Sequence, residues 1–269
     1  MRLTVLVDNY THVGTKFRGE PGLSYLLEVD GKKVLFDTGF SDLFIQNAAA
    51  MNLSLDDLDA VALSHGHGDH TGGLAPLLGI TQKKRPKLVM HPLALVEKQK
   101  DGEQFGLTVP LENLRKAYDI ESSSTPVWLS EHLVFLGEIP RHHQFENQEP
   151  LGERMHSGEL VPDTLLDDSA MALRTEKGLF IISGCAHAGI SNIIDYARIV
   201  CQESRVHGVI GGFHLLKADE RTQKTAEFLR DTHVTNLYPA HCTSFKAKAA
   251  INQIVPIKEI AVGTILPLT

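Results

Sequence analysis

The sequence has little cysteine, a single tryptophan and no long apolar run, and each shortage excludes a class of protein. Only three of the 269 residues are cysteine. An odd, small number of cysteines does not indicate a disulfide-stapled scaffold, so a reducing cytoplasm is the expected compartment. No stretch approaches the apolar length that crosses a bilayer. The first residues, interrupted by Asp8, are too short an apolar run for a secretory signal.

Positive charge is also scarce. The chain has 26 Lys and Arg against 33 Asp and Glu, a net charge of −7 at pH 7. This balance lacks the basic surface that is typical of proteins that bind nucleic acid or anionic membranes, so we expect neither as a partner. A small, anionic molecule is not excluded. The chain also lacks a G-x-S-x-G nucleophile turn and a Walker-type phosphate loop.

Histidine, by contrast, is abundant, with 14 in the chain. The segment "LSHGHGDHTG", residues 63–72, contains His65 and His67 directly after an apolar run that predicts a strand. Residues two apart on a strand face the same way, so these imidazoles are expected to meet at one point. Gly66 and Gly68 leave room for a sharp turn between and after them.

The same segment continues with Asp69 and His70, on the entry to a helix predicted for residues 72–80. The turn would direct these two side chains to a second point nearby. Neutral imidazole and carboxylate groups suit zinc, manganese or iron(II), and four of them are too many for one site that also holds water. The pattern therefore predicts two neighbouring divalent cations, zinc before manganese or iron.

Further candidate ligands follow three more predicted strands. They are Cys185 and His187 in "FIISGCAHAGI", His214 in "VIGGFHL", and His241 and Cys242 in "NLYPAHCT". Ligands gathered from successive strand ends are typical of the carboxyl edge of an open α/β sheet. We therefore expect these side chains to converge on the residues of the first motif.

The remaining pattern predicts mixed α/β layers in a single domain, residues 1–269. A hairpin is expected over 23–39 and another over 169–184, with β character over 58–64, 87–92 and 127–141. Residues 97–124 are more polar and harder to interpret, and 142–168 are rich in charge and turn formers without clear periodicity. We expect a lid or insert around 97–168. Alternating elements follow: helices over 41–53, 110–118, 190–203, 220–231 and 245–255, and strands over 206–214, 236–241 and 262–266.

These motifs match a known family. "SHGHGDHTGG" and the upstream "VLFDTG" resemble the metallo-β-lactamase superfamily, whose four-layer αββα sandwich carries a metal site at one edge of two packed sheets. "SGCAHAGI", "GGFHLL", "PAHCT" and "LGEIPR" resemble the branch of 7,8-dihydropterin-6-methyl-4-(β-D-ribofuranosyl)aminobenzene-5′-phosphate synthase-like proteins. The resemblance extends over nearly the whole chain, from about Asp8 to His241.

The resemblance implies a ligand set. His65, His67 and His187 would hold the first metal, and Asp69, His70 and His241 the second. Many members of the superfamily carry a bridging aspartate where this chain has Cys185. Two interpretations of Cys185 stay open, a direct thiolate ligand and a small packing residue.

Other polar residues have weaker assignments. Asp37 in "FDTG" is expected to orient a ligand histidine, with a turn-forming role as the alternative. His214 is a candidate substrate contact, acid or additional metal ligand, with packing as the alternative. Arg141 is a candidate phosphate contact, whereas "KKR" at residues 83–85 is expected to be a solvated helix end. Many members of the superfamily carry a further histidine between the first motif and the strand before Cys185. It has no clear counterpart here, although His142 and His143 lie in roughly that stretch. The remaining histidines are expected to be structural or on the surface: His12, His91, His132, His156, His207 and His233.

The predicted chemistry is metal-assisted hydrolysis of a phosphorylated or pterin-like small molecule. Asp69 would both bind metal and accept a hydrogen bond from the attacking hydroxide. The resemblance adds a synthase that joins a pterin to an aminobenzene ribotide. A thioester or lactone hydrolase of glyoxalase II type, and a metal-binding redox or sensor protein, remain alternatives.

Overall fold

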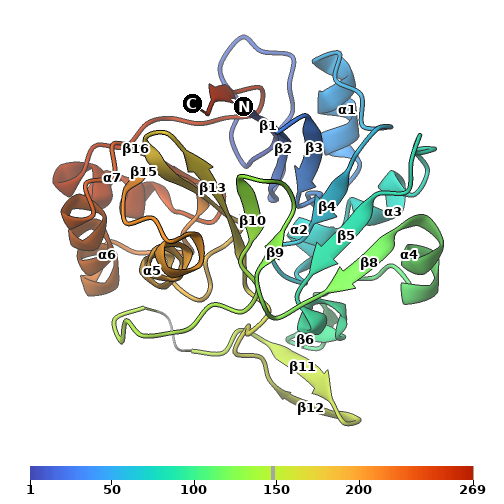
Figure 1. The fold of residues 1–269 in the computed structure, drawn as a ribbon. Helices are drawn as coiled ribbons and strands as arrows, with labels where there is room; N and C mark the ends of the chain where they lie inside the picture. Colours follow the sequence, from blue (N-terminus) through green and yellow to red (C-terminus); the bar gives the residue numbers. More distant parts are fainter. Residues whose placement is uncertain (147–148, 269) are drawn as a thin grey trace.

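Two β-sheets lie face to face at the centre of the computed structural model, with helices on both outer sides (Figure 1). The structure describes residues 1–146 and 149–268. Residues 147 and 148, which belong to the predicted insert 97–168, lie outside the described residues.

The first sheet has seven strands in the order β17-β1-β2-β3-β4-β5-β8. The hairpin predicted around "DGK" is formed by β2 (Ser24–Val29) and β3 (Lys32–Phe36), which pair from Tyr25↔Phe36 to Val29↔Lys32. From β3 onward the strands are parallel, so their carboxyl ends share one edge. The strands are β1 (Arg2–Val7), β2 (Ser24–Val29), β3 (Lys32–Phe36), β4 (Ala60–Ala62), β5 (Lys87–Met90), β8 (Asp119–Ser122) and β17 (Ile265–Pro267).

The second sheet has six strands in the order β16-β15-β14-β13-β10-β9. Its strands β14, β15 and β16 are parallel, and their carboxyl ends again share one edge. The strands are β9 (Val127–Trp128), β10 (Leu133–Phe135), β13 (Ala170–Thr175), β14 (Gly178–Ser183), β15 (Val206–Gly212) and β16 (Asn236–Ala240).

The helices divide between the two outer faces, as Figure 1 shows. Those of the first half of the chain lie beside the first sheet: α1 (Leu43–Ala50), α2 (Gly68–Thr71), α3 (Leu74–Leu77), the 3₁₀ turn η1 (Pro92–Leu95) and α4 (Leu111–Ala117). Those of the second half cover the second sheet: α5 (Ile190–Cys201), α6 (Glu220–Asp231) and α7 (Phe245–Ile254). Among the described residues, no helix is long and apolar enough to span a membrane.

Three apolar clusters hold these layers together. One joins the two sheets through residues such as Phe36, Phe135 and Ile182. A second packs α1 and its neighbours on the first sheet, and a third packs α5, α6 and α7 on the second sheet. Both faces of each sheet are therefore covered, which explains the continuous apolar runs of the central strands. The predicted four-layer αββα arrangement is confirmed.

Two local predictions were wrong in part. The helix expected over 72–80 is only the four residues of α3, and a separate short helix, α2, precedes it from Gly68 to Thr71. The stretch 142–168, expected to lack regular structure, contains the hairpin β11 (Glu153–His156) and β12 (Glu159–Pro162). It extends a small sheet with β6 (Lys98–Lys100) and β7 (Glu103–Gln104). The residues of β11 and β12 are all exposed or half-buried, so their sequence has no alternation of apolar and polar residues.

Candidate metal centre

The candidate site residues follow strand ends in both sheets. In the first sheet, Asp37 comes directly after β3 and His65 follows β4. In the second sheet, Cys185 follows β14, and His241 comes directly after β16. Because the carboxyl ends of these strands share an edge, side chains from both halves of the chain reach one place, as the sequence predicted.

The first motif forms the turn between β4 and α2. His67 has extended backbone, with φ −69° and ψ 149°, and stands immediately before the helix. His65 and His67 are buried, and His65 Nε2 lies 2.9 Å from His67 Nδ1. The two imidazoles therefore lie at one point, and Asp69 and His70 follow on the first turn of the helix.

One group of potential ligand atoms comprises His65, Cys185 and His187, whose nitrogen and sulfur atoms all lie within 4.8 Å of one another. The His187 ring lies 5.1 Å from the His67 ring, centre to centre, so His67 borders the same space. The structure thus brings together the residues predicted for a first metal.

A second group comprises Asp69, His70, Cys185 and His241, again within 4.8 Å of one another. Asp69 Oδ2 lies 3.3 Å from His241 Nε2 and 3.6 Å from His70 Nε2. Cys185 Sγ lies 3.2 Å from His70 Nε2 and belongs to both groups. It occupies the shared position between them.

Several of these atoms are buried without a hydrogen-bond partner among the described residues. They are His67 Nε2, both ring nitrogens of His187 and Asp69 Oδ1. Burying an unpaired polar atom costs free energy, and a protein seldom retains several in one place. Imidazole, carboxylate and thiolate are the donors that zinc uses, so the residues present fit a divalent metal pair.

The electrostatics favour neutral imidazoles at the first group. Burial, more than any neighbour, lowers the pKa of His67 to about 3. Burial and the surrounding imidazoles also hold the pKa values of His65 and His187 well below the usual range. A neutral imidazole keeps a lone pair available for a metal.

Asp37 orients the His70 ring by a contact with Nδ1, the ring nitrogen that does not face the ligand group. Its Oδ2 lies 2.7 Å from His70 Nδ1 and also accepts the hydroxyl of Ser64 at 2.7 Å. Burial would lower the pKa of His70, but the carboxylates of Asp69 and Asp37 outweigh it and raise that pKa to about 9. The contact directs His70 Nε2 toward Cys185 and Asp69, as expected for a carboxylate that orients a ligand.

Asp8 and Asn9, in the segment after β1, hold His241 in position, a role that was not predicted from the sequence. Asn9 Oδ1 lies 2.9 Å from His241 Nδ1, and Asp8 Oδ2 accepts the His241 backbone N–H at 3.1 Å. Their place in the sequence could have indicated this role, because Asp8 and Asn9 directly follow the apolar strand "LTVLV". They repeat the strand-end pattern of the other site residues.

A buried ion cluster behind the first motif was also missed. Lys98 donates to Asp163 and Asp167, at 2.5 Å and 3.0 Å, and all three are at most 1% exposed. Asp167 in turn accepts the Gly66 N–H at 2.8 Å. A Cβ on Gly66 would lie 2.6 Å from the Ala94 carbonyl oxygen, so the turn requires glycine there. The insert region thus positions the motif.

Asp168 supports the other half of the site. Its Oδ2 accepts the Ala188 N–H at 2.9 Å, and burial raises its pKa to about 7. The loop that it holds carries Cys185 and His187.

Four site residues other than glycine have left-handed backbone. Asp37, Ala186, His214 and His241 have φ between 46° and 55°. Such conformations cost free energy and concentrate at functional sites. Here each one follows a strand end and turns the chain sharply toward the ligand groups.

Of the remaining candidates, His214 belongs to a third group of potential ligand atoms, with Cys185 and Cys242, all within 4.8 Å of one another. The His214 ring lies 4.3 Å from the His187 ring, and its Nδ1 is buried without a described partner. The Arg141 guanidinium donates to the carbonyls of Thr164 and Leu165, at 2.6 Å and 2.9 Å. The substrate roles of both residues stay predictions. His143 pairs with Asp195 at 2.8 Å, away from the ligand groups.

The other basic candidates are accounted for by contacts elsewhere. Lys83 and Lys84 pair with exposed or half-buried carboxylates of Asp56 and Asp59. In the part of the chain that the structure describes, none of the six histidines expected to be structural or on the surface belongs to a ligand group.

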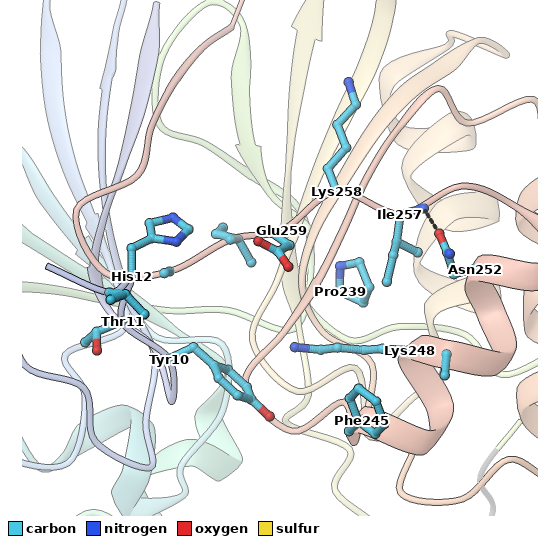
Figure 2. Close-up of a pocket in the computed structure, with 14 residues that line it drawn as sticks. Tyr10, Thr11, His12, Pro239, Phe245, Lys248, Asn252, Ile257, Lys258 and Glu259 are labelled. Atoms are coloured by element: carbon cyan, nitrogen blue, oxygen red, sulfur yellow. Dashed lines mark hydrogen bonds between the residues drawn. The ribbon is translucent and has the colours of Figure 1, made fainter. Parts of the chain in front are cut away.

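A cavity of about 500 Å³ adjoins Asp69. Its walls include Phe40 and Phe105, and the Phe105 ring lies 4.3 Å from the His67 ring. A larger cavity of about 660 Å³ lies between the segment after β1, α7 and residues 257–261. There Lys248 Nζ lies 4.5 Å from the centre of the Tyr10 ring (Figure 2). None of its lining residues belongs to a ligand group, whereas Asp69 lines the cavity described first.

Comparison with known proteins agrees with this geometry. The family model of the metallo-beta-lactamase superfamily matches residues 17–230. The chain belongs to this superfamily. Within it, the chain is 33% identical to the 7,8-dihydropterin-6-methyl-4-(β-D-ribofuranosyl)-aminobenzene-5′-phosphate synthase of Methanocaldococcus jannaschii, over 92% of this chain and 89% of the relative.

Solved structures of the superfamily have the same fold. Tm1679, described as a metal-dependent hydrolase, superposes with a TM-score of 0.85 at 28% identity, covering 100% of this chain and 99% of that chain. A diphosphatase of the PhnP family superposes with a TM-score of 0.55 at 15% identity, covering 100% and 98%. At that identity the second likeness concerns the fold alone.

Proposed function

We propose that this chain is a dinuclear metal-dependent hydrolase that acts on a phosphorylated or pterin-like small molecule. The observation that carries the proposal is the set of buried, unpaired ligand atoms beside the cavity at Asp69. Its volume lies within the roughly 300–1,000 Å³ of small-molecule sites. We expect an anionic small molecule as the partner, and neither nucleic acid nor a membrane.

Two cations would be held by the groups described above. His65, His67 and His187 would hold one cation; Asp69, His70 and His241 would hold the other, and Cys185 would serve both. Zinc is the proposed metal, because it accepts imidazole, carboxylate and thiolate together; manganese and iron(II) are the alternatives. A bound metal pair would supply charge for a developing oxyanion and a hydroxide near neutral pH.

The chain's own residues would bind and orient the reactants. Asp69 lines the cavity, and its unpaired Oδ1 can accept a hydrogen bond from the attacking water. Phe40 and Phe105 offer aromatic faces for a flat ring and exclude water around it. His214, beside His187, is placed to contact the substrate or to donate a proton.

A synthase is the second candidate, favoured by the name of the relative that is 33% identical to this chain. The named product joins a dihydropterin to an aminobenzene ribotide. In that reaction, an arylamine nitrogen would take the place of water as the nucleophile, and the same cavity would hold the dihydropterin.

The two candidates are separated by supplying or withholding the arylamine. Zinc-loaded protein would be incubated with phosphodiester and ester probes, and with a dihydropterin diphosphate in the presence and absence of an arylamine. Turnover without the amine supports the hydrolase, whereas turnover of the dihydropterin only with the amine supports the synthase. Turnover that survives both chelation and the His67→Ala/Asp69→Ala change would contradict a metal-dependent enzyme of either kind.

A further inference from the structure

Cys185 has a second thiol beside it. Cys242 comes next to His241, after β16, and its sulfur lies within 4.8 Å of Cys185 Sγ. Cys242 Sγ also lies 3.6 Å from the Cys185 carbonyl oxygen. With Cys185 and His214 it forms the third group of potential ligand atoms, to which the proposed metal pair assigns no ion.

The two cysteines approach each other past the end of the strand between them, where Gly212 has no side chain. They follow β14 and β16, and β15 lies between those strands. Gly212, the last residue of β15, donates its N–H to the Gly184 carbonyl at 2.9 Å. A Cβ on Gly212 would lie 2.5 Å from Cys242 Sγ and 3.3 Å from Cys185 Cα. Any side chain at Gly212 would therefore fill the space in which the thiols approach.

The thiols differ in exposure. Cys185 is 3% exposed, whereas Cys242 is half-buried. The third cysteine, Cys201, lies at the end of α5 in the apolar cluster under the second sheet and has neither of the others in its group. Only one pair in the described residues is therefore placed for a disulfide.

We propose that Cys185 and Cys242 form a reversible disulfide when the centre is free of metal and a peroxide is present. The Cys242 thiolate attacks one oxygen of hydrogen peroxide, the O–O bond breaks, and a sulfenic acid and hydroxide form; the proton lost from the thiol converts the hydroxide into water. The Cys185 sulfur then displaces the hydroxyl group, so that an S–S bond and a second water form. Two thiols are oxidised, one peroxide is reduced, and a dithiol reductant reverses the reaction.

The disulfide has a consequence for the centre. Cys185 Sγ belongs to both ligand groups, and a disulfide sulfur has no negative charge to offer a cation. Oxidation therefore removes a ligand from both groups, and a bound metal in turn engages Cys185 and protects it. This second step rests on the proposed metal centre, whereas formation of the disulfide does not.

The chemical step is tested by peptide mapping of chelator-treated protein. Protein exposed to a small excess of hydrogen peroxide is alkylated, digested and analysed by mass spectrometry without reduction. We expect a cross-link between the Cys185 and Cys242 peptides, a loss of two hydrogen atoms, and Cys201 still alkylated. The Cys201→Ser variant should give the same cross-link. Three alkylated cysteines after oxidation, or cross-links through Cys201, would overturn the proposal.

Two variants test the geometry. Cys242→Ser should give no cross-link, and Gly212→Ala should give it much more slowly, because the added methyl group occupies the approach path. Circular dichroism establishes that each variant is folded. If Gly212→Ala does not fold, Cys242→Ser alone decides, because serine fits where cysteine does. An undiminished cross-link yield in folded Gly212→Ala would contradict the approach path.

Metal binding is measured separately. Oxidised, reduced and re-reduced proteins are titrated with zinc against a competing chelator. We expect about tenfold weaker zinc binding after oxidation, recovered on reduction, and slower cross-linking of zinc-loaded protein. A cross-link with unchanged zinc affinity would refute the link to the centre but leave the disulfide. Absence of zinc binding in the reduced protein would refute the proposed function.

Discussion

Asp37 Oδ2 and His70 Nδ1 lie 2.7 Å apart, and both side chains are fully buried. The carboxylate accepts from Nδ1 and leaves Nε2 facing the second ligand group. Asp37→Asn would present an amide that can donate, which favours the opposite tautomer. We expect metal affinity to fall about 10- to 100-fold, measured by competition with a chelator. Asp42→Asn, at the exposed start of α1, is the matched control and should leave affinity unchanged.

The first motif is tested by the double change His67→Ala/Asp69→Ala. Both side chains carry buried, unpaired atoms that a cation would use. We expect a folded protein whose metal content, measured by elemental analysis, falls with its activity. His132→Ala, at an exposed pair with Asp30, serves as the control. Unchanged metal stoichiometry in the double variant would show that the motif is not the ligand set.

Cys185→Ser distinguishes the two interpretations of that residue. Because its sulfur belongs to both ligand groups, we expect the variant to retain fewer metal ions per chain than Cys201→Ser does. Both changes replace a buried thiol with a hydroxyl. A difference in metal content between the two variants is therefore due to the location of Cys185 and not to the loss of a thiol as such. Equal metal content in the two variants would identify Cys185 as a packing residue.

Lys98 is expected to be a major contributor to folding stability. Lys98→Met leaves the carboxylates of Asp163 and Asp167 buried without their cation, which costs about 3–5 kcal/mol in the free energy of unfolding. Lys83→Met removes an exposed partner of Asp56, 66% exposed on the lysine side, and should cost less than about 1 kcal/mol. Urea denaturation at pH 7 measures both.

The difference between wild type and Lys98→Met should depend on pH. Burial alone would raise the pKa of Asp167, but the Lys98 ammonium outweighs it and, with the Gly66 N–H, lowers that pKa. In the wild type this contribution is present above the unfolded pKa of an aspartate and is lost as pH falls through the lower, folded one. In the variant the unpaired carboxylates take up protons more readily, so the stability gap narrows toward acid. A gap that widens as pH falls would contradict this account.

Sequence alone predicted the parts of the site that have a local signature. The H-x-H-x-D-H spacing fixes which side chains share a point, because strand and turn geometry act over a few residues. The strand ends that carry Cys185, His187 and His241 were also found, since each follows a recognisable apolar run. Their convergence was expected because the carboxyl ends of neighbouring parallel strands share one sheet edge, and the structure brings them together.

What escaped prediction depends on distant partners. Asn9 and His241 are 232 positions apart, and Lys98 and Asp167 are 69 apart. Nothing in either local segment indicates which charged or amide side chain will be enclosed with which. The hairpin β11–β12 was missed for a different reason, because neither of its faces is buried enough to impose alternation.

The sharing of ligands between the two sheets has a mechanical consequence. His65, His67, Asp69 and His70 belong to the half of the chain that forms the first sheet, and Cys185, His187 and His241 belong to the half that forms the second. A cation held by both would crosslink the two halves at this edge, so its loss would weaken their contact there while the apolar contacts between the sheets remain. Separation of the two halves at this edge and binding of the cation would then be thermodynamically coupled.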